Sequence, residues 1–350
     1  MRPLRALPLL LLLAACGSKD KAATPADTPA AAPVGPFAYV SNEDSRNITV
    51  IDLATDSVVA TIEVGTRPRG VKVSHDGKSV YVALSGSPKC PPSMPDEECE
   101  KLRKDPTQDG VAVVDVATRT KVKTLPGGSD PETFDVSHDD KVLFVSNEDA
   151  GVASFLDIAS GEIIRTVKVG EEPEGVTVQP DGKIVWVTGE TDHNIVGVTT
   201  DSGRIVANID VGKRPRSVAF LPDGSKGYVT NEVSGTVSVI DMAKKKKVKA
   251  IDMGKDARPM GLAVAADGRR VYASLGRGKT VAAIDPANDS VVATVEVGTR
   301  PWGLALSPDG KKLYTANGPD NTVTVVDVAT MTVLKKIPVG SVPWGVAIAQ

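Results

Sequence analysis

Seven proline-centred steps carry most of the side chains in this chain that could do chemistry. Each has the form residue-Pro-residue, and in chain order they are Arg67-Pro68-Arg69, Asp130-Pro131-Glu132, Glu172-Pro173-Glu174, Arg214-Pro215-Arg216, Arg258-Pro259-Met260, Arg300-Pro301-Trp302 and Val342-Pro343-Trp344. Arginine binds anions through its charge and its fixed fork of donors, and tryptophan offers an aromatic face for stacking. Proline fixes its own φ and restrains the residue before it, so these side chains should be held in defined orientations.

Two interpretations of these steps compete. In the structural one, Arg69 pairs with Glu132, and Glu174 pairs with Arg216, as bidentate salt bridges between neighbouring repeats. In the functional one, the later steps form a pocket for a planar or anionic small ligand through charge and stacking. The candidate binding residues are Arg67, Arg69, Glu132, Glu174, Arg214, Arg216, Arg258, Arg300, Trp302 and Trp344. We expect a structural role for most of them and a ligand near Arg214, Arg258, Arg300, Trp302 and Trp344.

The sequence offers no direct support for catalysis. The chain has three histidines and lacks a Cys-x-x-Cys-His haem motif, a serine nucleophile motif and a calcium loop of spaced aspartates. A general acid or base would have to come from Glu132, Glu148, Glu174, Glu190, Glu232 or His193, and carboxylates beside arginines are usually ion-paired. We therefore predict no catalytic residue, no metal site and no cofactor.

A repeated unit of four short strands must position the proline steps. The clearest copy is Thr299 to Gly340, in which Val323 and Val325 alternate with threonines at the period of two that a strand requires. The Asp309-Gly310 pair predicts a two-residue hairpin turn, because glycine accepts a positive φ. A four-stranded unit cannot bury both of its faces alone, so it needs copies of itself.

The copies are marked by an apolar anchor in the second strand of each unit. The anchors are Tyr39, Tyr81, Phe144, Trp186, Tyr228, Tyr272 and Tyr314, with successive spacings of 42, 63, 42, 42, 44 and 42 residues. A period near 42 with four strands and no helical pattern is typical of propeller blades. The sequence therefore predicts an all-β, seven-bladed β-propeller over residues 37–350.

The two ends of the repeat region predict how the ring closes. The region opens at Phe37 with the second strand of a unit, and it ends after a segment that matches only the start of a unit. Residues 344–349 should therefore supply the innermost strand of the blade whose other three strands lie between residues 37 and 64. Such pairing leaves no open edge in the ring.

The strand order sorts the loops onto two faces. The proline steps should ring the mouth of the central channel, surrounded by Glu43, Glu148, Glu190 and Glu232 from the loops between second and third strands. The Asp-Gly turns and the run Lys244 to Lys247 should lie on the opposite face, where a lysine run is most simply a solvated turn.

The N-terminus has the features of an export signal. Residues 1–16 combine Arg2 and Arg5 with a short apolar run, and they end in Leu13-Ala14-Ala15-Cys16, which resembles the bacterial lipobox. That resemblance implies lipidation of Cys16, cleavage just before it and anchoring in the outer membrane. Residues 17–36 are rich in Ala, Pro and Thr and predict a flexible tether. Without Arg2 and Arg5 the charge is 39 minus 44, or −5, so nothing suggests nucleic-acid binding.

The long interval of 63 residues reflects an insertion over residues 85–110. It contains Cys90 and Cys99, which we expect to form a disulfide after export to an oxidising compartment. A zinc site is the alternative, but no histidine lies nearby and the cysteine spacing does not fit a zinc knuckle. The insertion is predicted to lie on the mouth face, as a lid, a partner-docking loop or a neutral addition.

The tetrapeptide Tyr228-Val229-Thr230-Asn231 and its variants at Tyr39 and Phe144 resemble the YVTN family of β-propellers. The order of the proline steps is more narrowly similar to periplasmic propellers associated with alcohol catabolism dependent on pyrroloquinoline quinone (PQQ). This resemblance implies a non-enzymatic accessory protein of quinoprotein oxidation. The lipobox and the cysteine-bearing insertion depart from that pattern.

Three functions remain open at this point. The first is a binding or scaffold propeller, exported and lipid-anchored in the outer membrane toward the periplasm or at the cell surface, acting as a monomer on an envelope protein or on a small anionic or planar ligand. The second is a propeller enzyme of the lactonase or lyase type. The third is an adhesion or surface-layer protein.

Overall fold

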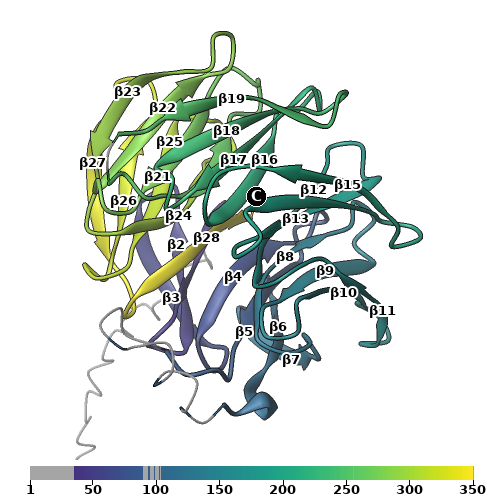
Figure 1. The fold of residues 1–350 in the computed structure, drawn as a ribbon. Helices are drawn as coiled ribbons and strands as arrows, with labels where there is room; N and C mark the ends of the chain where they lie inside the picture. Colours follow the sequence, from purple (N-terminus) through teal and green to yellow (C-terminus); the bar gives the residue numbers. More distant parts are fainter. Residues whose placement is uncertain are drawn as a thin grey trace, which may run out of the picture. The chain divides into compact units, whose positions relative to one another are not determined.

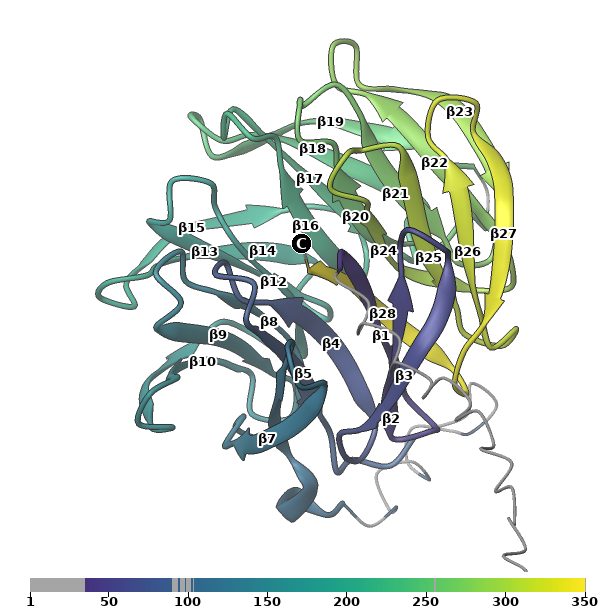
Figure 2. The ribbon, with the colours of Figure 1, turned by 180° about the vertical axis from the view of Figure 1, so that it is seen from behind.

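Seven antiparallel sheets of four strands each stand around one axis (Figures 1 and 2). The computed structural model describes residues 35–89, 94, 98, 102, 104–254 and 256–349. The strands belong to a compact unit that spans Gly35–Gln350. The seven-bladed β-propeller predicted from the repeat is therefore confirmed.

We name the blades A to G and order the strands of each blade from the innermost to the outermost. Blade A contains β28 (Pro343–Ala349), β1 (Phe37–Asn42), β2 (Asn47–Asp52) and β3 (Ser57–Glu63); blade B contains β4 (Pro68–Val73), β5 (Ser79–Leu84), β6 (Gly110–Asp115) and β7 (Thr120–Leu125); blade C contains β8 (Pro131–Val136), β9 (Val142–Asn147), β10 (Val152–Asp157) and β11 (Ile163–Lys168). Blade D contains β12 (Pro173–Val178), β13 (Ile184–Gly189), β14 (Asn194–Thr199) and β15 (Ile205–Asp210); blade E contains β16 (Pro215–Phe220), β17 (Lys226–Asn231), β18 (Thr236–Asp241) and β19 (Lys246–Asp252). Blade F contains β20 (Pro259–Val264), β21 (Val271–Leu275), β22 (Thr280–Asp285) and β23 (Ser290–Glu296); blade G contains β24 (Pro301–Leu306), β25 (Lys312–Asn317), β26 (Thr322–Asp327) and β27 (Thr332–Pro338).

The hydrophobic core consists of separate layers between neighbouring blades. Each blade buries one face against the blade before it and the other against the blade after it, because side chains alternate along a strand. The predicted anchors take part in these layers: Tyr39 lies in the layer between blades A and B, and Tyr314 lies in the layer between blades G and A. All seven anchors are buried, with exposed fractions of 0% to 4%.

The ring closes as the sequence predicts. Strand β28 pairs antiparallel with β1, with Phe37 opposite Ala349 and Tyr39 opposite Ala347. Each inner strand contacts the inner strands of both neighbouring blades all the way round the ring. The last strand of the chain is thus hydrogen-bonded to the first, and blade A is made from both ends of the repeat region.

The two-residue turn predicted at Asp309-Gly310 is wrong in its length. Five residues separate β24 from β25, since β24 ends at Leu306 and β25 begins at Lys312. Ser307 Oγ donates to Asp309 Oδ1 at 2.6 Å, and Ser307 N donates to Lys312 O at 2.8 Å, which closes a wider loop. The expected positive φ is present at Gly310, at 68°.

A hydroxyl near the end of the second strand fastens one blade to the next. In β17, Thr230 Oγ1 donates to Met260 O of blade F at 2.6 Å and accepts from Ser217 N of its own inner strand at 3.0 Å. Ser41, Ser146 and Ser274 occupy the corresponding position and donate to the carbonyl oxygens of Arg69, Glu174 and Trp302. We call these four contacts the hydroxyl clasps. They fix the distance between neighbouring inner strands.

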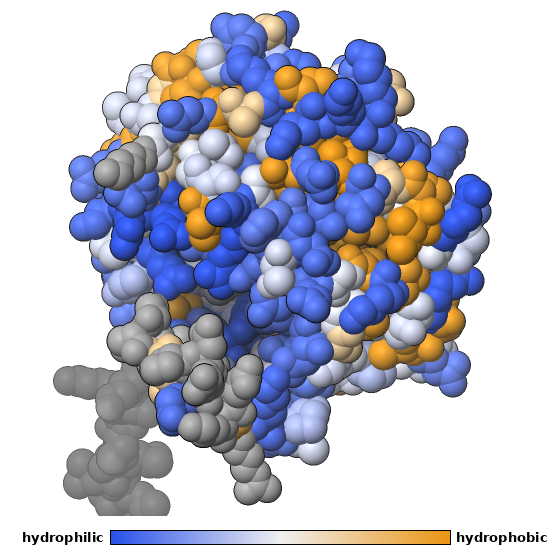
Figure 3. All heavy atoms as spheres, in the orientation of Figure 1, coloured by the Kyte–Doolittle hydropathy of each residue, from blue (hydrophilic) through white to orange (hydrophobic). Residues whose placement is uncertain are grey.

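The face of the molecule drawn in Figure 3 is mostly hydrophilic, with separate hydrophobic patches. The outermost strands contribute exposed apolar side chains, such as Ile164 of β11 and Leu334 of β27, at 55% and 53% exposed. Among the described residues, no helix has the length and hydrophobicity that crossing a membrane requires.

Several predictions from the sequence fall outside the described residues. Residues 1–34, with the signal and Cys16, are not described, nor are Cys90 and Cys99. Those predictions stay predictions. The described parts of the insertion connect β5 with β6, as expected, and include the short 3-10 helix η1 (Pro106–Gln108).

Removing one hydroxyl clasp should destabilise the ring. In Thr230→Val, the Met260 carbonyl and the Ser217 amide lose a buried partner, which should lower the free energy of unfolding by about 1–3 kcal/mol. Chemical denaturation monitored by circular dichroism measures this change. Thr315→Val is the matched control, because Thr315 lies buried in β25 and its hydroxyl has no hydrogen-bond partner among the described residues. Equal losses in both variants would contradict the role of the clasp.

Candidate functional site

The seven residues that precede the prolines share an unusual backbone conformation. Their φ angles lie between 43° and 58° at Arg67, Asp130, Glu172, Arg214, Arg258, Arg300 and Val342. A non-glycine residue in this left-handed region costs on the order of 1–3 kcal/mol and persists only where its surroundings hold it. In every blade except B, its carbonyl oxygen accepts a backbone hydrogen bond from the loop after the second strand, as from Glu190 N to Glu172 O at 3.0 Å. The proline steps are therefore held rigidly around the mouth of the channel.

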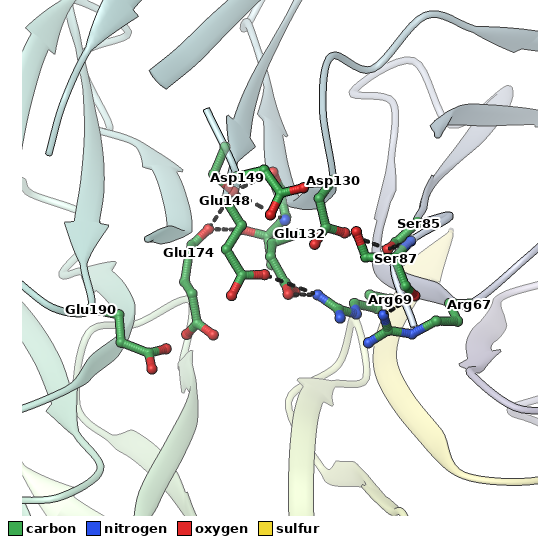
Figure 4. Close-up of polar contacts among 12 residues, drawn as sticks. Arg67, Arg69, Ser85, Ser87, Asp130, Glu132, Glu148, Asp149, Glu174 and Glu190 are labelled. Carbon is green, nitrogen blue, oxygen red and sulfur yellow. Dashed lines mark hydrogen bonds and ion pairs between the residues drawn. The ribbon is translucent and has the colours of Figure 1, made fainter. Parts of the chain in front are cut away.

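Arg69 lies at the centre of one cluster of carboxylates on this mouth. Its guanidinium contacts Glu132 of blade C directly, and Nη1 lies 3.6 Å from Glu148 Oε2 while Nε lies 3.6 Å from Glu43 Oε1. Figure 4 shows Glu132 and Glu148 pointing toward Arg69, with Arg67 beside it. Arg67 Nη2 binds Glu43 Oε1 at 3.0 Å. The salt bridge predicted between Arg69 and Glu132 is present as a single contact between Nη1 and Oε1, whereas the sequence predicts a bidentate pair.

Arg216 lies at the centre of a second cluster of the same form. It contacts Glu174 of blade D directly, while Nη1 lies 2.6 Å from Glu190 Oε2 and Nε lies 2.7 Å from Glu232 Oε2. The Arg216 side chain is 8% exposed, so the three carboxylates replace water around the buried guanidinium. The predicted pair of Glu174 with Arg216 is present, and Arg214 joins it through a close contact with Glu190.

The carboxyl groups of the two clusters differ in pKa. Burial alone would raise the pKa of Glu43 and Glu232, but the neighbouring arginines outweigh it and lower the pKa of both. Burial raises the pKa of Glu190 to about 7; Arg214 opposes this, and the nearby carboxylates of Glu172 and Glu148 add to it. Burial also raises the pKa of Glu148. Around neutral pH the mouth therefore holds at least one carboxyl that can exchange a proton.

The opposite sector of the mouth, formed by the proline steps of blades F, G and A, has cations without paired carboxylates. The loop positions filled by glutamate in blades A, C, D and E are Gly276 in blade F and Gly318 in blade G. Among the described residues, neither Arg258 nor Arg300 makes an ion pair. Arg300 Cζ lies 4.9 Å from the centroid of the Trp302 ring. Both arginines interact electrostatically with Glu232 without forming an ion pair with it. This sector, which we call the uncompensated sector, therefore has two guanidinium groups that can bind an anion.

Two tryptophans extend the same sector. The ring centroids of Trp302 and Trp344 are 5.3 Å apart, with 34° between their planes. Arg216 Cζ lies 5.8 Å from the Trp302 centroid, so the Arg216 cluster and the tryptophans adjoin each other. Below the mouth, the seven inner strands line a cavity of about 450 Å³, a volume typical of small-molecule sites.

The insertion packs against the mouth on the side of blades A to C. Asp109 accepts from Gly86 N at 2.7 Å and from Asp130 N at 3.1 Å, so it ties the insertion to the proline step of blade C. Lys104 Nζ contacts Asp149 Oδ1 at 2.5 Å. The described parts of the insertion thus border the Arg69 cluster.

The structure sorts the ten predicted binding residues into three groups around one mouth. Arg67, Arg69 and Glu132 belong to the first cluster, Glu174, Arg214 and Arg216 to the second, and Arg258, Arg300, Trp302 and Trp344 to the uncompensated sector. The sequence placed Glu43, Glu148, Glu190 and Glu232 around the ring without including them in the site. Their shared position directly after the second strand is the signal that could have included them.

The three histidines of the chain do not come together as a site. His193 Nδ1 lies 2.9 Å from the carbonyl oxygen of Glu190, so its ring is engaged with the backbone of its own loop. His75 and His138 lie together near the Asp-Gly turns, with ring centroids 5.3 Å apart. Within the described ranges, no group of three or more His, Cys, Asp or Glu side chains is arranged to hold a metal ion.

Comparison with protein families gives one match that covers most of the chain. The family described as "Lactonase, 7-bladed beta-propeller" matches residues 29–180 and 176–337. A curated relative, Antigen Lp49 of Leptospira interrogans, is 33% identical over 109 residues, which is 31% of this chain. The match spans 22% of the length of that relative.

Solved structures share the fold at low sequence identity. Hydrazine synthase of Kuenenia stuttgartiensis aligns with a TM-score of 0.72 and 23% identity over 89% of this chain and 99% of its own. A structure from Bacteroides fragilis, described as a candidate 6-phosphogluconolactonase, aligns with a TM-score of 0.72 and 20% identity over 92% of this chain and 100% of its own. A structure from Bacteroides uniformis with the same description gives 0.72 and 18% over 90% and 100%. At these identities the likeness shows the fold alone.

The raised pKa of Glu190 predicts how stability depends on pH. Its pKa is about 7 in the folded protein against 4.5 ordinarily, so in that interval the folded state binds more protons than the unfolded state and stability falls as pH rises. In Glu190→Gln the side chain cannot ionise, so the thermal midpoint should fall less between about pH 5 and 8. Thermal unfolding followed at several pH values measures both slopes.

Glu43→Gln is the control for this experiment. The pKa of Glu43 is lowered, so Glu43 does not contribute to the fall of stability as pH rises. Glu43→Gln should therefore show the same fall in thermal midpoint between about pH 5 and 8 as the wild type. Parallel profiles for wild type and Glu190→Gln would contradict the assignment.

Proposed function

The chain belongs to the family of seven-bladed β-propeller lactonases, and from this premise we propose that it hydrolyses a cyclic ester at the mouth of its channel. The observation that carries the proposal is the family match over residues 29–180 and 176–337. Because a propeller fold by itself does not specify a reaction, the chemistry has to be argued from the mouth. The enzyme considered as an alternative from the sequence thereby becomes the main proposal.

Glu190 is the proposed general base. Hydrolysis of an ester near neutral pH requires a group that can take a proton from water, and such a group works best when its pKa lies near the working pH. Glu190, with a pKa of about 7, meets that requirement, whereas Glu43 and Glu232 have lowered pKa values. Its contacts with Arg214 and Arg216 fix the orientation of the carboxylate.

Ester hydrolysis also requires stabilisation of the negative charge that develops in the transition state. The unpaired guanidinium groups can supply it. Attack of water on the lactone carbonyl places a negative charge on the carbonyl oxygen, and preorganised cations lower the energy of that state. Arg300 and Arg258 are the cations for this role, since neither makes an ion pair in the described chain. Arg216 lies between Glu190 and Trp302 and links the base to this sector.

The proposed hydrolysis uses water as the nucleophile and Glu190 as the group that carries the proton. Glu190 accepts a proton from water as the water oxygen bonds to the carbonyl carbon, and the bond between that carbon and the ring oxygen then breaks. The protonated Glu190 returns its proton to the alkoxide that leaves. The product is the open-chain hydroxy acid, whose carboxylate can bind Arg258 or Arg300.

A binding module without catalysis is the second candidate. It is favoured by the stacked Trp302 and Trp344 next to Arg300, which suit a planar anion as well as they suit a reacting ester. The association with PQQ-dependent oxidation gains no support from the relatives described above and is a weaker proposal. The partners and the monomeric state expected from the sequence likewise stay proposals.

Export and membrane anchoring are part of the proposal. The lipobox ending at Cys16 supports a lipid anchor in the outer membrane, facing the periplasm or the cell surface, with residues 17–36 as a tether. Cells fed a clickable palmitate analogue should label the wild type and fail to label Cys16→Ser. Equal labelling of both would rule out this anchor.

Lactone hydrolysis tests the main proposal. Acid release from δ-valerolactone, D-glucono-δ-lactone and 6-phosphoglucono-δ-lactone can be followed in a pH-stat. Glu190→Gln should lower kcat/KM by about 10²- to 10⁴-fold, the usual contribution of a general base. With the base active only when deprotonated, kcat/KM of the wild type should rise with pH toward a plateau above about pH 7.

Glu43→Gln is the matched control, because it removes an equally buried carboxylate whose ion pairs are with Arg67, Arg69 and Lys89. Its kcat/KM should stay within about threefold of wild type. If the wild type hydrolyses none of the three lactones, or if Glu190→Gln is as active as wild type, the proposed function or its base is wrong.

A further inference from the structure

The wall of the central channel has both polar and apolar side chains on blades B, C and D, and apolar side chains or glycine on blades F, G and A. On blades B, C and D the lining includes Lys72, Thr133 and Thr177. These side chains already have partners: Lys72 Nζ lies 3.3 Å from Asp135 Oδ1, Thr133 Oγ1 donates to Glu174 O at 2.5 Å, and Thr177 Oγ1 donates to Val218 O at 2.7 Å. These three polar side chains of the wall are therefore largely satisfied by internal contacts.

The apolar half lies on blades F, G and A. Its lining includes Leu262 of β20, Ala305 of β24, and Val346 and Ile348 of β28. All four are only partly buried, although they lie on the innermost strands. They can contribute hydrophobic contacts and no side-chain hydrogen bonds, so an apolar ligand group would gain free energy by covering them.

This apolar wall leads directly up to the uncompensated sector of the mouth. Met260, Trp302 and Trp344 begin the same three strands and also line the cavity. The residues that follow them are Gly261, Gly303 and Gly345; a Cβ on Gly303 would lie 2.7 Å from Trp344 O. Glycine thus lets neighbouring inner strands approach closely at this level. A strip of apolar surface runs from the unpaired Arg258 and Arg300 down into the channel.

The charge and the apolar strip together define one kind of ligand. A purely ionic ligand would leave the strip uncovered, and a purely apolar ligand would leave the two guanidinium charges without a counter-ion. The cavity of about 450 Å³ has the size of a small-molecule site and is enclosed by the seven inner strands. The best fit is a molecule with a polar, acid-forming end and an unbranched apolar chain.

Resting on the proposed lactone hydrolysis, we propose that the substrate is a lactone carrying an unbranched alkyl or acyl chain. The alkyl or acyl chain of the substrate lies in the channel along Leu262, Ala305 and Val346. The ester ring of the substrate stays at the mouth near Glu190. After ring opening the new carboxylate binds Arg258 and Arg300, while the chain stays in place. The product is therefore an amphiphilic hydroxy acid.

A series of γ-lactones tests the proposal by activity. γ-Butyrolactone has no side chain, and γ-octalactone and γ-decalactone carry unbranched chains on the same ring. Each buried methylene should raise kcat/KM by about two- to fourfold, until the channel is filled. A series that is hydrolysed with no dependence on chain length would overturn the inference and leave the proposed hydrolysis standing.

Binding of carboxylic acids tests the same site without catalysis. Isothermal titration calorimetry should give at least about tenfold tighter binding of decanoate than of butyrate. Arg300→Gln should weaken the binding of both acids, because it removes the charge that both use. Equal affinity for the two acids would overturn the inference. Chain-dependent binding without hydrolysis of any lactone would support the channel site and overturn the proposed function.

Two substitutions test where the alkyl chain of the ligand lies in the channel. Ala305→Phe should fill the channel and reduce decanoate affinity by about tenfold or more, so that the preference for decanoate over butyrate is lost. Val346→Thr keeps the side-chain shape and places a hydroxyl on the strip, so it should weaken decanoate binding by about threefold if Ala305→Phe fails to fold. Unchanged decanoate binding in a folded variant of either kind would contradict the assigned path.

Discussion

Contact between the inner strands of neighbouring blades is the constraint on which the rest of this structure depends. Four hydroxyl clasps connect the end of one second strand to the proline step of the next blade, as from Ser41 to Arg69 O and from Ser274 to Trp302 O. The glycines after the proline steps allow this approach, since a Cβ on Gly175 would collide with Arg216 O. The clasps therefore hold the inner strands of neighbouring blades together at four of the seven blade junctions.

Rigid placement makes the two halves of the mouth chemically different. Arg69 of blade B and Arg216 of blade E are buried among glutamates of blades A, C, D and E, and removal of a partner would leave an uncompensated buried charge. On blades F and G, glycine replaces the loop glutamate, so Arg258 and Arg300 keep their charge unpaired among the described residues. The first half holds the ring together, and the second is free to bind. Glu190 lies where the two halves meet through Arg216 and Trp302.

A division of this kind explains how one architecture can serve as a binding protein or an enzyme. The left-handed residues before the prolines are kept in place by backbone hydrogen bonds, so the mouth is ordered before any ligand arrives. Preorganised charge is what stabilises a transition state, and the same charge also binds a stable anion. The family match favours lactone chemistry, and the carboxyl of Glu190 near its titration point gives that chemistry a base.

The sequence alone determined the number of blades, the closure through residues 344–349, the ring of proline steps and the pairs of Arg69 with Glu132 and Arg216 with Glu174. These features follow from local rules: strand periodicity, turn residues and a repeat of about 42 residues that places equivalent positions at equivalent heights. The tertiary structure decided which carboxylates share a guanidinium, and thus that Glu190 titrates near neutrality while Glu43 does not. It also decided which arginines stay unpaired and which half of the channel is apolar. Those properties depend on burial and on distances between blades, and a periodic sequence carries no measure of either.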